Sequence, residues 1–528
     1  MAITGPTTDA PAASEATTRH PTATLVTVCI GMFMLMLDMT IVAAALANIQ
    51  TSLDASLSGL QWVVDAYTLP VAALLLTAAT LGDRIGRRRL YIAGMTVFTL
   101  ASLGCALAGS VAVLNAVRAV QGVGAALLFG VSLPLVAAAF PEPTKRAKAI
   151  GVYGAVMAAA TAAGPLVGGA LVTAFGWEWI FLINVPIGIG AIALACRYVA
   201  ESRSATAQPA DWIGTGLLTL GLFPGVLALI QGNDWGWSSP RVLALGAVSV
   251  LSSVAFVIHE LRARFPMLDV RLVVRPAFAA NALAAAASAG TLVAATNFLA
   301  LYFINTLGHD PFQAGLRALP LTLAGLLVAP PVAVLQHRWP ARWSLPISLA
   351  AVAIGLWLCT GSDAGTTWTH FVAGSIVGGG GLGALTVIAS QTALTFVSDD
   401  RAGMATGAVS TARQIGTVIG VAGLGAVFSH AVATEARAGL AHLPVGSMTV
   451  NVPAPQAQAV TDGLAAGGGL RILEFVPEQF AAATPALSTL ARGASAHGLD
   501  AVMATGSTVA AVAAAAVFVL CRIGRRSR

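Results

Sequence analysis

Residues 31–47 read Gly-Met-Phe-Met-Leu-Met-Leu-Asp-Met-Thr-Ile-Val-Ala-Ala-Ala-Leu-Ala, an apolar run with a single carboxylate, Asp38, near its centre. The run extends further toward the N-terminus, so it is long enough to cross a bilayer as a helix, which takes roughly 20 residues. An ionisable group inside such a helix is costly unless it is paired or reaches water. This stretch therefore predicts both a membrane-spanning helix and a functional residue.

The composition of the whole chain agrees with a membrane protein. Of 528 residues, 28 are Lys or Arg and 22 are Asp or Glu, so 9% are charged, against roughly 25% in an average soluble domain. Hydrophobic residues make up 57% and the mean hydropathy is +0.82. No soluble fold hides that much apolar surface behind so little charge, and an all-α membrane protein is predicted.

Hydropathy indicates fourteen membrane-spanning helices. Their centres lie near residues 36, 70, 100, 125, 160, 187, 221, 250, 289, 324, 352, 381, 416 and 512. With the N-terminus inside, 21 of the 28 basic residues fall on the cytoplasmic side, five fall outside and two lie within spans. Because cytoplasmic loops are enriched in Lys and Arg, we expect both termini in the cytoplasm and the chain in the cell inner membrane.

An internal repeat is indicated by two loops. The loops at residues 81–88 and 335–342 share a Leu and two Arg at matching positions, which pairs the tenth span with the second and predicts two six-helix bundles separated by two inserted helices. The predicted parts are a disordered cytoplasmic tail at 1–24, an N-terminal bundle at 25–200, two linker transmembrane helices at 201–262, a C-terminal bundle at 263–522 including an external loop at 431–502, and a basic cytoplasmic tail at 523–528. The external loop is expected to be a solvated insert, with capping of the outer mouth as the alternative.

Asp38 in the first span and Arg118 in the fourth are predicted to meet. At 1.5 Å per residue both lie at about the same depth of a core roughly 30 Å thick, so we expect them to share one polar cavity, directly or through water. A carboxyl group whose partner or hydration changes as the cavity switches sides binds a proton on one face and releases it on the other. The alternative is a static ion pair that only fixes helix packing.

Four further polar residues are possible cavity residues: Asp65, Gln121, Arg413 and Gln414. Asp65 is expected at the outer mouth of the second span as a solvated acid. Arg413 lies about ten residues into the span centred near residue 416, where it is expected to bond backbone carbonyls or a cavity water, with substrate binding as the alternative.

The fifth span carries the stretch Ala163-Gly-Pro-Leu-Val-Gly-Gly169. Pro165 removes a helix hydrogen bond and is expected to kink the span, while Gly164, Gly168 and Gly169 allow a neighbouring helix to approach closely. The chain has no P-loop, no metal-ligand spacing and no arrangement suited to an enzyme active site. We therefore expect no enzyme activity and no cofactor, with a proton gradient as the energy source.

Four stretches together resemble the major facilitator superfamily, and specifically its fourteen-span branch of drug:proton antiporters. The stretches are residues 37–42, 81–89, 114–126 and 164–169, the last preceded by Gly151. The resemblance implies the major facilitator fold, a proton-coupling role for Arg118 and an antiporter motif at 164–169. It also implies a gating motif that latches the cytoplasmic side, made of Asp83, Arg84, Gly86, Arg87 and Arg88.

The function implied by this resemblance is multidrug or antibiotic efflux by alternating access between two bundles. The expected partners are an amphipathic or aromatic small molecule, protons and the lipid bilayer, without nucleic acid, and the chain is expected to be a monomer. Self-resistance to a secreted antibiotic is one form of this function. The alternatives are a proton-linked nutrient or metabolite transporter of the same superfamily and, from a different class, a channel or sensor.

Overall fold

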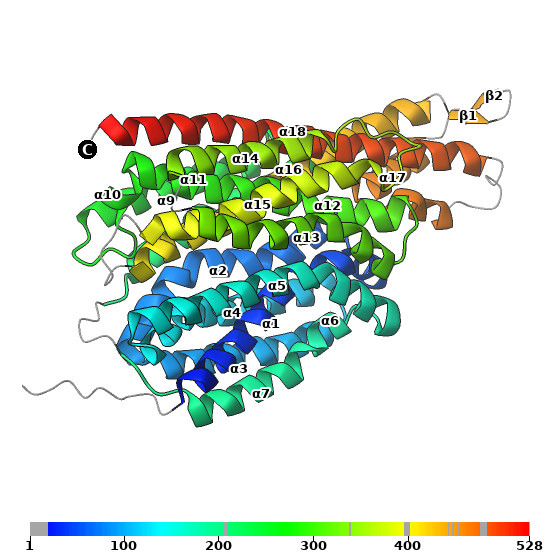
Figure 1. Ribbon diagram of the computed structural model, residues 1–528. Helices are drawn as coiled ribbons and strands as arrows, with labels where there is room; N and C mark the ends of the chain where they lie inside the picture. The colour runs from blue at the N-terminus through cyan, green and yellow to red at the C-terminus, as the bar shows by residue number, and fades with distance from the viewer. Residues whose placement is uncertain are drawn as a thin grey trace, which may run out of the picture.

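The computed structural model describes residues 20–203, 209–336, 339–394, 402–441, 443–445, 448–450, 454–475 and 483–526, and long helices running side by side dominate it (Figure 1). The first part of the chain forms α1 (Pro21–Ser52), α2 (Leu57–Ile85), α3 (Arg87–Ala106), α4 (Val111–Ala139), α5 (Pro143–Phe175), α6 (Trp179–Leu182), α7 (Asn184–Tyr198), α8 (Trp212–Trp235), α9 (Pro240–Arg262) and α10 (Val270–Val273).

The second part forms α11 (Pro276–Ser288), the π-helix η1 (Ala289–Val293), α12 (Ala294–Leu301), the π-helix η2 (Tyr302–Thr306), α13 (Pro311–Leu335), α14 (Ala341–Trp357), α15 (His370–Leu394), α16 (Ala402–Ala441), α17 (Ala454–Ala465), the 3₁₀ helix η4 (Gly469–Phe475) and α18 (Thr484–Arg526). Within the described ranges, strand is limited to one antiparallel pair, β1 (Leu443–Val445) and β2 (Met448–Val450), in which Leu443 faces Val450. The all-α prediction is confirmed.

Many of the helices begin at a residue that suits a helix start. Ser56, Ser110 and Asp310 each accept a hydrogen bond from the backbone N–H three residues later, at 3.1, 3.4 and 2.8 Å. Such caps satisfy amide groups that have no partner inside the helix. Proline, whose missing N–H costs nothing in the first turn, opens α1, α5, α9, α11 and α13.

Each of the fourteen predicted centres falls within a helix. In the described part of the chain, twelve helices are long and apolar enough to cross a membrane, and a thirteenth is added if the bent α5 is one span. The remaining candidate, α14, has 17 residues, about 25 Å at 1.5 Å per residue and so shorter than the usual hydrocarbon core. A count of fourteen complete spans stays a prediction.

The helix contacts of the first half recur in the second. In the first half α1 packs on α5, α2 and α3 pack on α4, and α3 packs on α7. In the second half α11 packs on α16, α13 and α14 pack on α15, and α14 packs on α18. The halves meet where α5 contacts α13 and where α16 contacts α2, which are equivalent pairs in the same scheme. This repetition agrees with the pairing of the second and tenth spans in the sequence.

The helices α8 and α9 form a pair beside the α2–α16 contact. α8 packs on both α2 and α16, and the hydroxyl groups of Thr77 on α2 and Thr215 on α8 lie 2.6 Å apart. Leu69 of α2 shares an apolar cluster with Val226 and Ile230 of α8. The two inserted helices therefore lie outside the repeat and cover one of the two lines where the halves meet.

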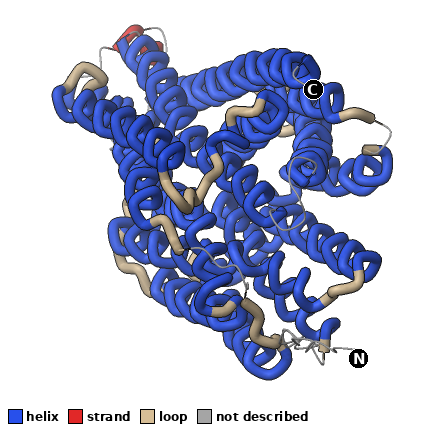
Figure 2. Tube along the Cα trace, turned by 90° about the vertical axis from the view of Figure 1, so that its left-hand side faces the viewer, coloured by secondary structure: helices blue, strands red, loops and turns tan. Residues whose placement is uncertain are grey.

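The beginning of α1 and the end of α18 lie at the same end of the molecule, which faces the viewer in Figure 2. Two predicted boundaries need correction. α1 begins at Pro21, so the predicted tail 1–24 is too long, and residues 1–19 of it lie outside the described residues. Helices α16 and α18 extend into the predicted loop 431–502, because α16 continues to Ala441 and α18 begins at Thr484. Residues 527–528 of the predicted basic tail also lie outside the described residues.

Candidate functional site

Asp38 on α1 and Arg118 on α4 form a direct ion pair inside the first half. Arg118 Nη1 donates to Asp38 Oδ2 at 2.7 Å, and the two residues are 0% and 1% exposed. Desolvation of two charges is compensated only when the geometry is good and the remaining lone pairs and protons find partners. The surroundings of this pair therefore decide what it can do.

Two amide side chains complete the coordination of the Asp38 carboxylate. Gln121 Nε2 on α4 and Asn184 Nδ2 on α7 both donate to Asp38 Oδ1 at 3.0 Å. They also donate to Ser102 Oγ on α3, at 2.8 and 3.4 Å, and Gln121 Oε1 accepts from Arg118 Nη1 at 2.7 Å. We call these five residues, from four helices, the Asp38 network.

The second helix of the chain holds Arg118 from the other side. Arg118 Nε donates to the carbonyl oxygen of Val63 at 3.0 Å, and the guanidinium lies 4.2 Å from the ring centroid of Tyr67. An arginine over an aromatic face gains a favourable electrostatic contact, especially where water is excluded. The network is thus enclosed by α1, α2, α3, α4 and α7, and in this conformation its carboxylate has no exposed surface.

Sequence reasoning named Asp38, Arg118 and Gln121 but missed Ser102, Asn184 and Tyr67. Ser102 and Asn184 are uncharged, so a search for ionisable residues passes over them. The available signal was an amide inside an apolar stretch, Ile183-Asn-Val-Pro186, because a buried amide requires a hydrogen-bonding partner.

The expectation that Asp65 is a solvated acid is wrong. Asp65 is 0% exposed, and neither carboxylate oxygen has a hydrogen-bond partner in the described part of the chain. Its side of α2 faces α16, because Gln61, one turn earlier, donates to Val421 O at 3.4 Å and Leu69, one turn later, shares an apolar cluster with Val418. Asp65 is therefore buried between the two halves and separate from the Asp38 network.

The two predicted cavity residues on α16 lie near the first half. Gln414 Nε2 is 4.0 Å from Met39 Sδ on α1. Arg413 is half-buried and lies near Tyr153 of α5. The structure therefore brings Arg413 and Gln414 to the boundary between the halves rather than to the Asp38 network.

The predicted cytoplasmic gating motif forms the turn between α2 and α3. Arg87 donates to Asp83 Oδ1 from Nη2 at 2.7 Å and from Nε at 2.9 Å. Gly86 has φ +117°, and a Cβ there would lie 2.6 Å from the Glu201 carboxylate. At position 86 only glycine fits both this backbone conformation and this close contact with Glu201. Arg84, in the same motif, is exposed.

Glu201, which sequence reasoning missed, is the second acid of this turn. Its Oε1 accepts from the backbone N–H of Arg88 at 3.1 Å, in the first turn of α3, and its Oε2 lies 3.7 Å from Arg89 Nε. The Arg88 side chain donates to the carbonyl oxygen of Cys196. In the ranges that the structure describes, these bonds join the motif to the end of α7 and its following residues, within the first half.

The predicted antiporter motif contacts both halves. α5 bends by 42° between residues 161 and 163, close to the carbonyl that Pro165 leaves without its helix partner. A Cβ at Gly164 or Gly168 would clash with Thr40 or Ile41 of α1, and a Cβ at Gly169 would lie 2.3 Å from the Pro311 carbonyl of α13. The glycines thus permit α5 to pack on α1 and on the opposite half together.

Part of the segment between α16 and α18 is bonded to the first half. Gln50 Nε2 on α1 donates to the carbonyl oxygen of Ala466 at 2.7 Å, and Arg471 Nη1 on η4 donates to the carbonyl oxygen of Ala47 at 2.8 Å. These bonds attach η4 and the residue that follows α17 to the first half. The expectation of a solvated loop therefore needs correction for residues 466–471.

The same segment is attached to the second half. Asn305 Nδ2 on η2 donates to Gly467 O at 2.8 Å and to Gln50 Oε1 at 2.9 Å. One amide thus joins α1, η2 and the segment at the end of the molecule opposite both termini (Figure 1). In the predicted topology this is the outer end, and the segment bridges the two halves there.

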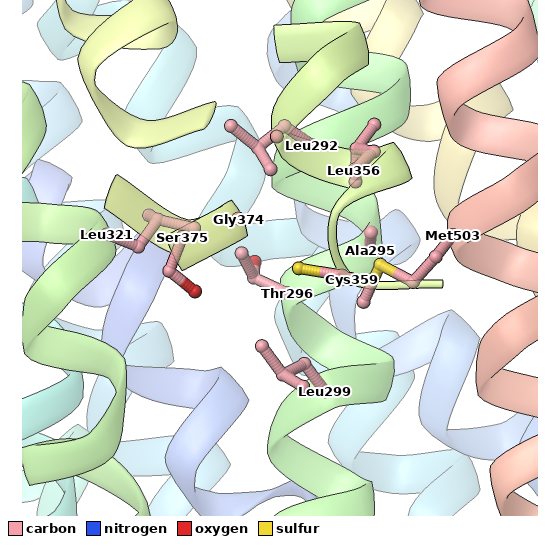
Figure 3. Close-up of a pocket in the computed structure, with 11 residues that line it drawn as sticks. Leu292, Ala295, Thr296, Leu299, Leu321, Leu356, Cys359, Gly374, Ser375 and Met503 are labelled. Carbon is pink, nitrogen blue, oxygen red and sulfur yellow. The ribbon is translucent and has the colours of Figure 1, made fainter. Parts of the chain in front are cut away.

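A small pocket lies in the second half, away from these residues. Its volume is about 10 Å³, room for roughly one water molecule. Leu292, Ala295, Leu356, Cys359 and Met503 are among the side chains around it (Figure 3). Its lining is almost entirely apolar, so it offers too little space and too few polar groups to hold a substrate in this conformation.

The chain was compared with curated proteins. It is 38% identical over 411 residues to the multidrug resistance protein Stp of Mycobacterium tuberculosis, covering 77% of this chain and 75% of that protein. It is 37% identical over 423 residues to the methylenomycin A resistance protein of Streptomyces coelicolor, covering 79% and 87%. It is 34% identical over 415 residues to the tetracenomycin C resistance and export protein of Streptomyces glaucescens, covering 78% and 76%.

Solved structures and a family model agree with these relatives. A crystal structure of a bacterial homologue of the human lysosomal transporter Spinster, in an inward-facing and unoccupied conformation, matches with a TM-score of 0.62 and 17% identity, covering 97% of this chain and 98% of that one. This match shows the fold, and the predicted fold class is confirmed. The family model of the Major Facilitator Superfamily matches residues 28–432. The chain is a transporter rather than an enzyme, and it belongs to the Major Facilitator Superfamily.

Proposed function

We propose that this chain exports drugs or antibiotics in exchange for inward-moving protons, as a member of the fourteen-span branch of drug:proton antiporters. Drug efflux is supported by relatives at 34 to 38% identity that are named for drug resistance or antibiotic export. Proton exchange, the fourteen-span branch and the substrate class go beyond those names. Self-resistance to a secreted antibiotic is part of the same proposal.

The observation that carries proton exchange is the Asp38 network. The Asp38 carboxylate accepts three hydrogen bonds, one of them from a cation, and is fully enclosed. Hydrogen bonds of this kind favour the charged form, whereas burial disfavours it. In our proposal a movement of the surrounding helices opens the network to water, Asp38 takes up a proton, and Arg118 is released.

Alternating access requires that the two ends of the molecule open in turn. At the predicted outer end the halves are in contact: α5 approaches α13 at Gly169, Gln61 on α2 bonds to α16, and residues 466–471 join α1 to η2. In our proposal these contacts keep that end closed. Release of a substrate to the outside requires that they part, and we propose that the turn at Asp83 to Arg88 then latches the cytoplasmic end.

The proposal includes the arrangement of the chain in the membrane. We place both termini in the cytoplasm and the protein in the inner membrane, because 21 of 28 basic residues then lie on the cytoplasmic side. We further propose that the chain works as a monomer. The bundles, which begin at Pro21 and at residue 263, rock about the site, with the helices at 201–262 as an inserted pair. The proton gradient supplies the energy, and no cofactor takes part.

The test is export measured with and without a proton gradient. The chain is produced in a bacterial host that lacks its own drug pumps, and a panel of antibiotics and dyes is screened for increased resistance. An uncoupler should abolish the resistance, and everted membrane vesicles should accumulate the same compounds only when their interior is acidic. No increase in resistance to any compound, together with proton-driven uptake of a nutrient, would favour the alternative of a metabolite importer.

A further inference from the structure

Arg413 is a charged residue that the Asp38 network and the cytoplasmic motif leave unused. It lies in the first third of α16, a helix that forms much of the boundary with the first half. The side chain is half-buried. None of the carboxylates that the structure describes forms an ion pair with it. Among the described residues, this guanidinium has therefore lost part of its water without gaining a counterion, which is an unusual feature inside a membrane protein.

The contacts of α16 show where Arg413 points. Val421 lies on the side that faces α2, while Gly416 and Gly420 lie on the side that faces α11 and η1, at the carbonyls of Ala286 and Gly290. At 100° per residue, Arg413 falls between these two sides. It therefore projects between α2 of the first half and α11 of the second half.

Two residues of the first half lie close to this position. Gln414, the next residue of α16, reaches Met39 Sδ on α1. Tyr153 on α5, a buried residue of the first half, lies near Arg413. The surroundings thus combine one cation, an amide, a thioether and an aromatic ring, contributed by helices of both halves.

From this arrangement we infer that Arg413 binds an acidic group of the exported molecule, and that the substrates include aromatic or amphipathic carboxylates and phenolates. This inference rests on the proposed efflux function and names the substrate class. A guanidinium forms two parallel hydrogen bonds to a carboxylate, and the partly exposed side chain of Met39 suits an apolar or aromatic body. Binding of an anion supplies a counterion that the described residues do not provide to Arg413.

Asp38 inside the first half and Asp65 at the boundary do not offer an equivalent site for a cation in this conformation. Asp38 is neutralised by Arg118 and is fully enclosed. Asp65 has no partner in the described residues, but it is 0% exposed. Arg413 retains exposed surface, so it is the charged group of the three that a molecule can reach. If substrates were cations, Asp65 would be the residue that recognises them.

The experiment compares two dyes of similar size and opposite charge. Fluorescein is an anion above neutral pH, and rhodamine 123 is a cation built on the same xanthene ring. Proton-driven uptake of each dye is measured in everted vesicles that contain the wild type, Arg413→Gln, Arg413→Lys or Asp65→Asn. Arg241→Gln is the matched control, since Arg241 is an exposed arginine at the start of α9.

We expect Arg413→Gln to reduce the apparent affinity for fluorescein by about tenfold or more, the size of one charge-assisted hydrogen bond. Arg413→Lys should retain part of the affinity, since it keeps the charge but not the planar fork. Uptake of rhodamine 123 should be equal or higher in Arg413→Gln, and Arg241→Gln should behave as the wild type.

Three results would overturn the inference. In the first, the wild type takes up rhodamine 123 but not fluorescein, and Asp65→Asn loses that uptake. In the second, Arg413→Gln loses the uptake of both dyes equally. In the third, Arg413→Gln changes the uptake of neither dye. If neither dye is exported, the compounds exported in the resistance panel are sorted by charge, and Arg413→Gln must then lower resistance to the acids selectively. A wild type that confers no resistance and moves neither dye contradicts the proposed efflux function itself. This outcome differs from the three results that overturn only the inference about Arg413.

Discussion

Replacing Asp38 by Asn while keeping Arg118 tests the central mechanism most directly. The substitution preserves the size of the side chain but removes its charge, so Arg118 stays buried without a counterion. We expect two consequences. Proton-driven export should be lost, because an amide takes up no proton near neutral pH. The protein should also become less stable.

The size of the stability loss follows from the geometry. The ion pair is 2.7 Å long, its two residues are 0% and 1% exposed, and two more bonds of 3.0 Å reach the same carboxylate. Removing one partner of such a buried pair costs about 3–5 kcal/mol. Removing both charges costs less, because neither is then left alone. The pair Asp38→Asn and Arg118→Gln should therefore show a coupling energy of about 2–3 kcal/mol.

The assay has two parts. Thermal unfolding in detergent is followed for the wild type, both single variants and the double variant, and drug-dependent proton release is followed in everted vesicles with a pH-sensitive dye. Asp54→Asn serves as the control, since Asp54 is an exposed acid in the turn between α1 and α2. The double variant should regain stability but not proton coupling. Retained coupling in Asp38→Asn, or single-variant losses that simply add, would refute the reasoning.

Three further predictions concern other parts of the molecule. Gly86→Ala should lower stability by about 1–3 kcal/mol in thermal unfolding, because φ is +117° and the new Cβ would meet Glu201; an unchanged melting temperature would contradict this. Thr215→Val loses the 2.6 Å bond between α8 and α2 and should cost about 1 kcal/mol without stopping export, so a dead variant would be unexpected. Arg471→Ala frees η4 from α1 and should speed labelling of an Ala466→Cys variant by an impermeant thiol reagent; equal rates in both backgrounds would count against a bridging role.

The sequence was sufficient to predict the helices and the central ion pair. Apolar length alone located every predicted centre within a helix, because a lipid-spanning segment must satisfy its backbone internally. Asp38 and Arg118 could be paired by depth, since the rise per residue and the bilayer thickness are both fixed. Depth gives the level of a residue in the membrane but not the direction in which its side chain points around the helix axis. It therefore does not identify the uncharged side chains, such as Asn184, that complete the Asp38 network.

The errors concerned residues whose surroundings are set by distant parts of the chain. Asp65 lies near a helix end and looks solvated from its neighbours in sequence, but its burial depends on α16, more than 340 residues later. Residues 466–471 carry little hydrophobic pattern, and what holds them is a set of hydrogen bonds to the carbonyls and amides of α1 and η2. Neither feature has a local signature in composition or periodicity.

The inserted pair α8 and α9 makes the two equivalent lines of contact unequal. At the α2–α16 line α8 touches both partners, so protein covers this contact. At the α5–α13 line no third helix of the described chain makes comparable contact with both, and we expect acyl chains of the bilayer to border it. A hydrophobic substrate dissolved in the membrane would thus find the α5–α13 contact accessible from the lipid and the α2–α16 contact covered by α8. We expect lipid composition to affect transport through the α5–α13 contact.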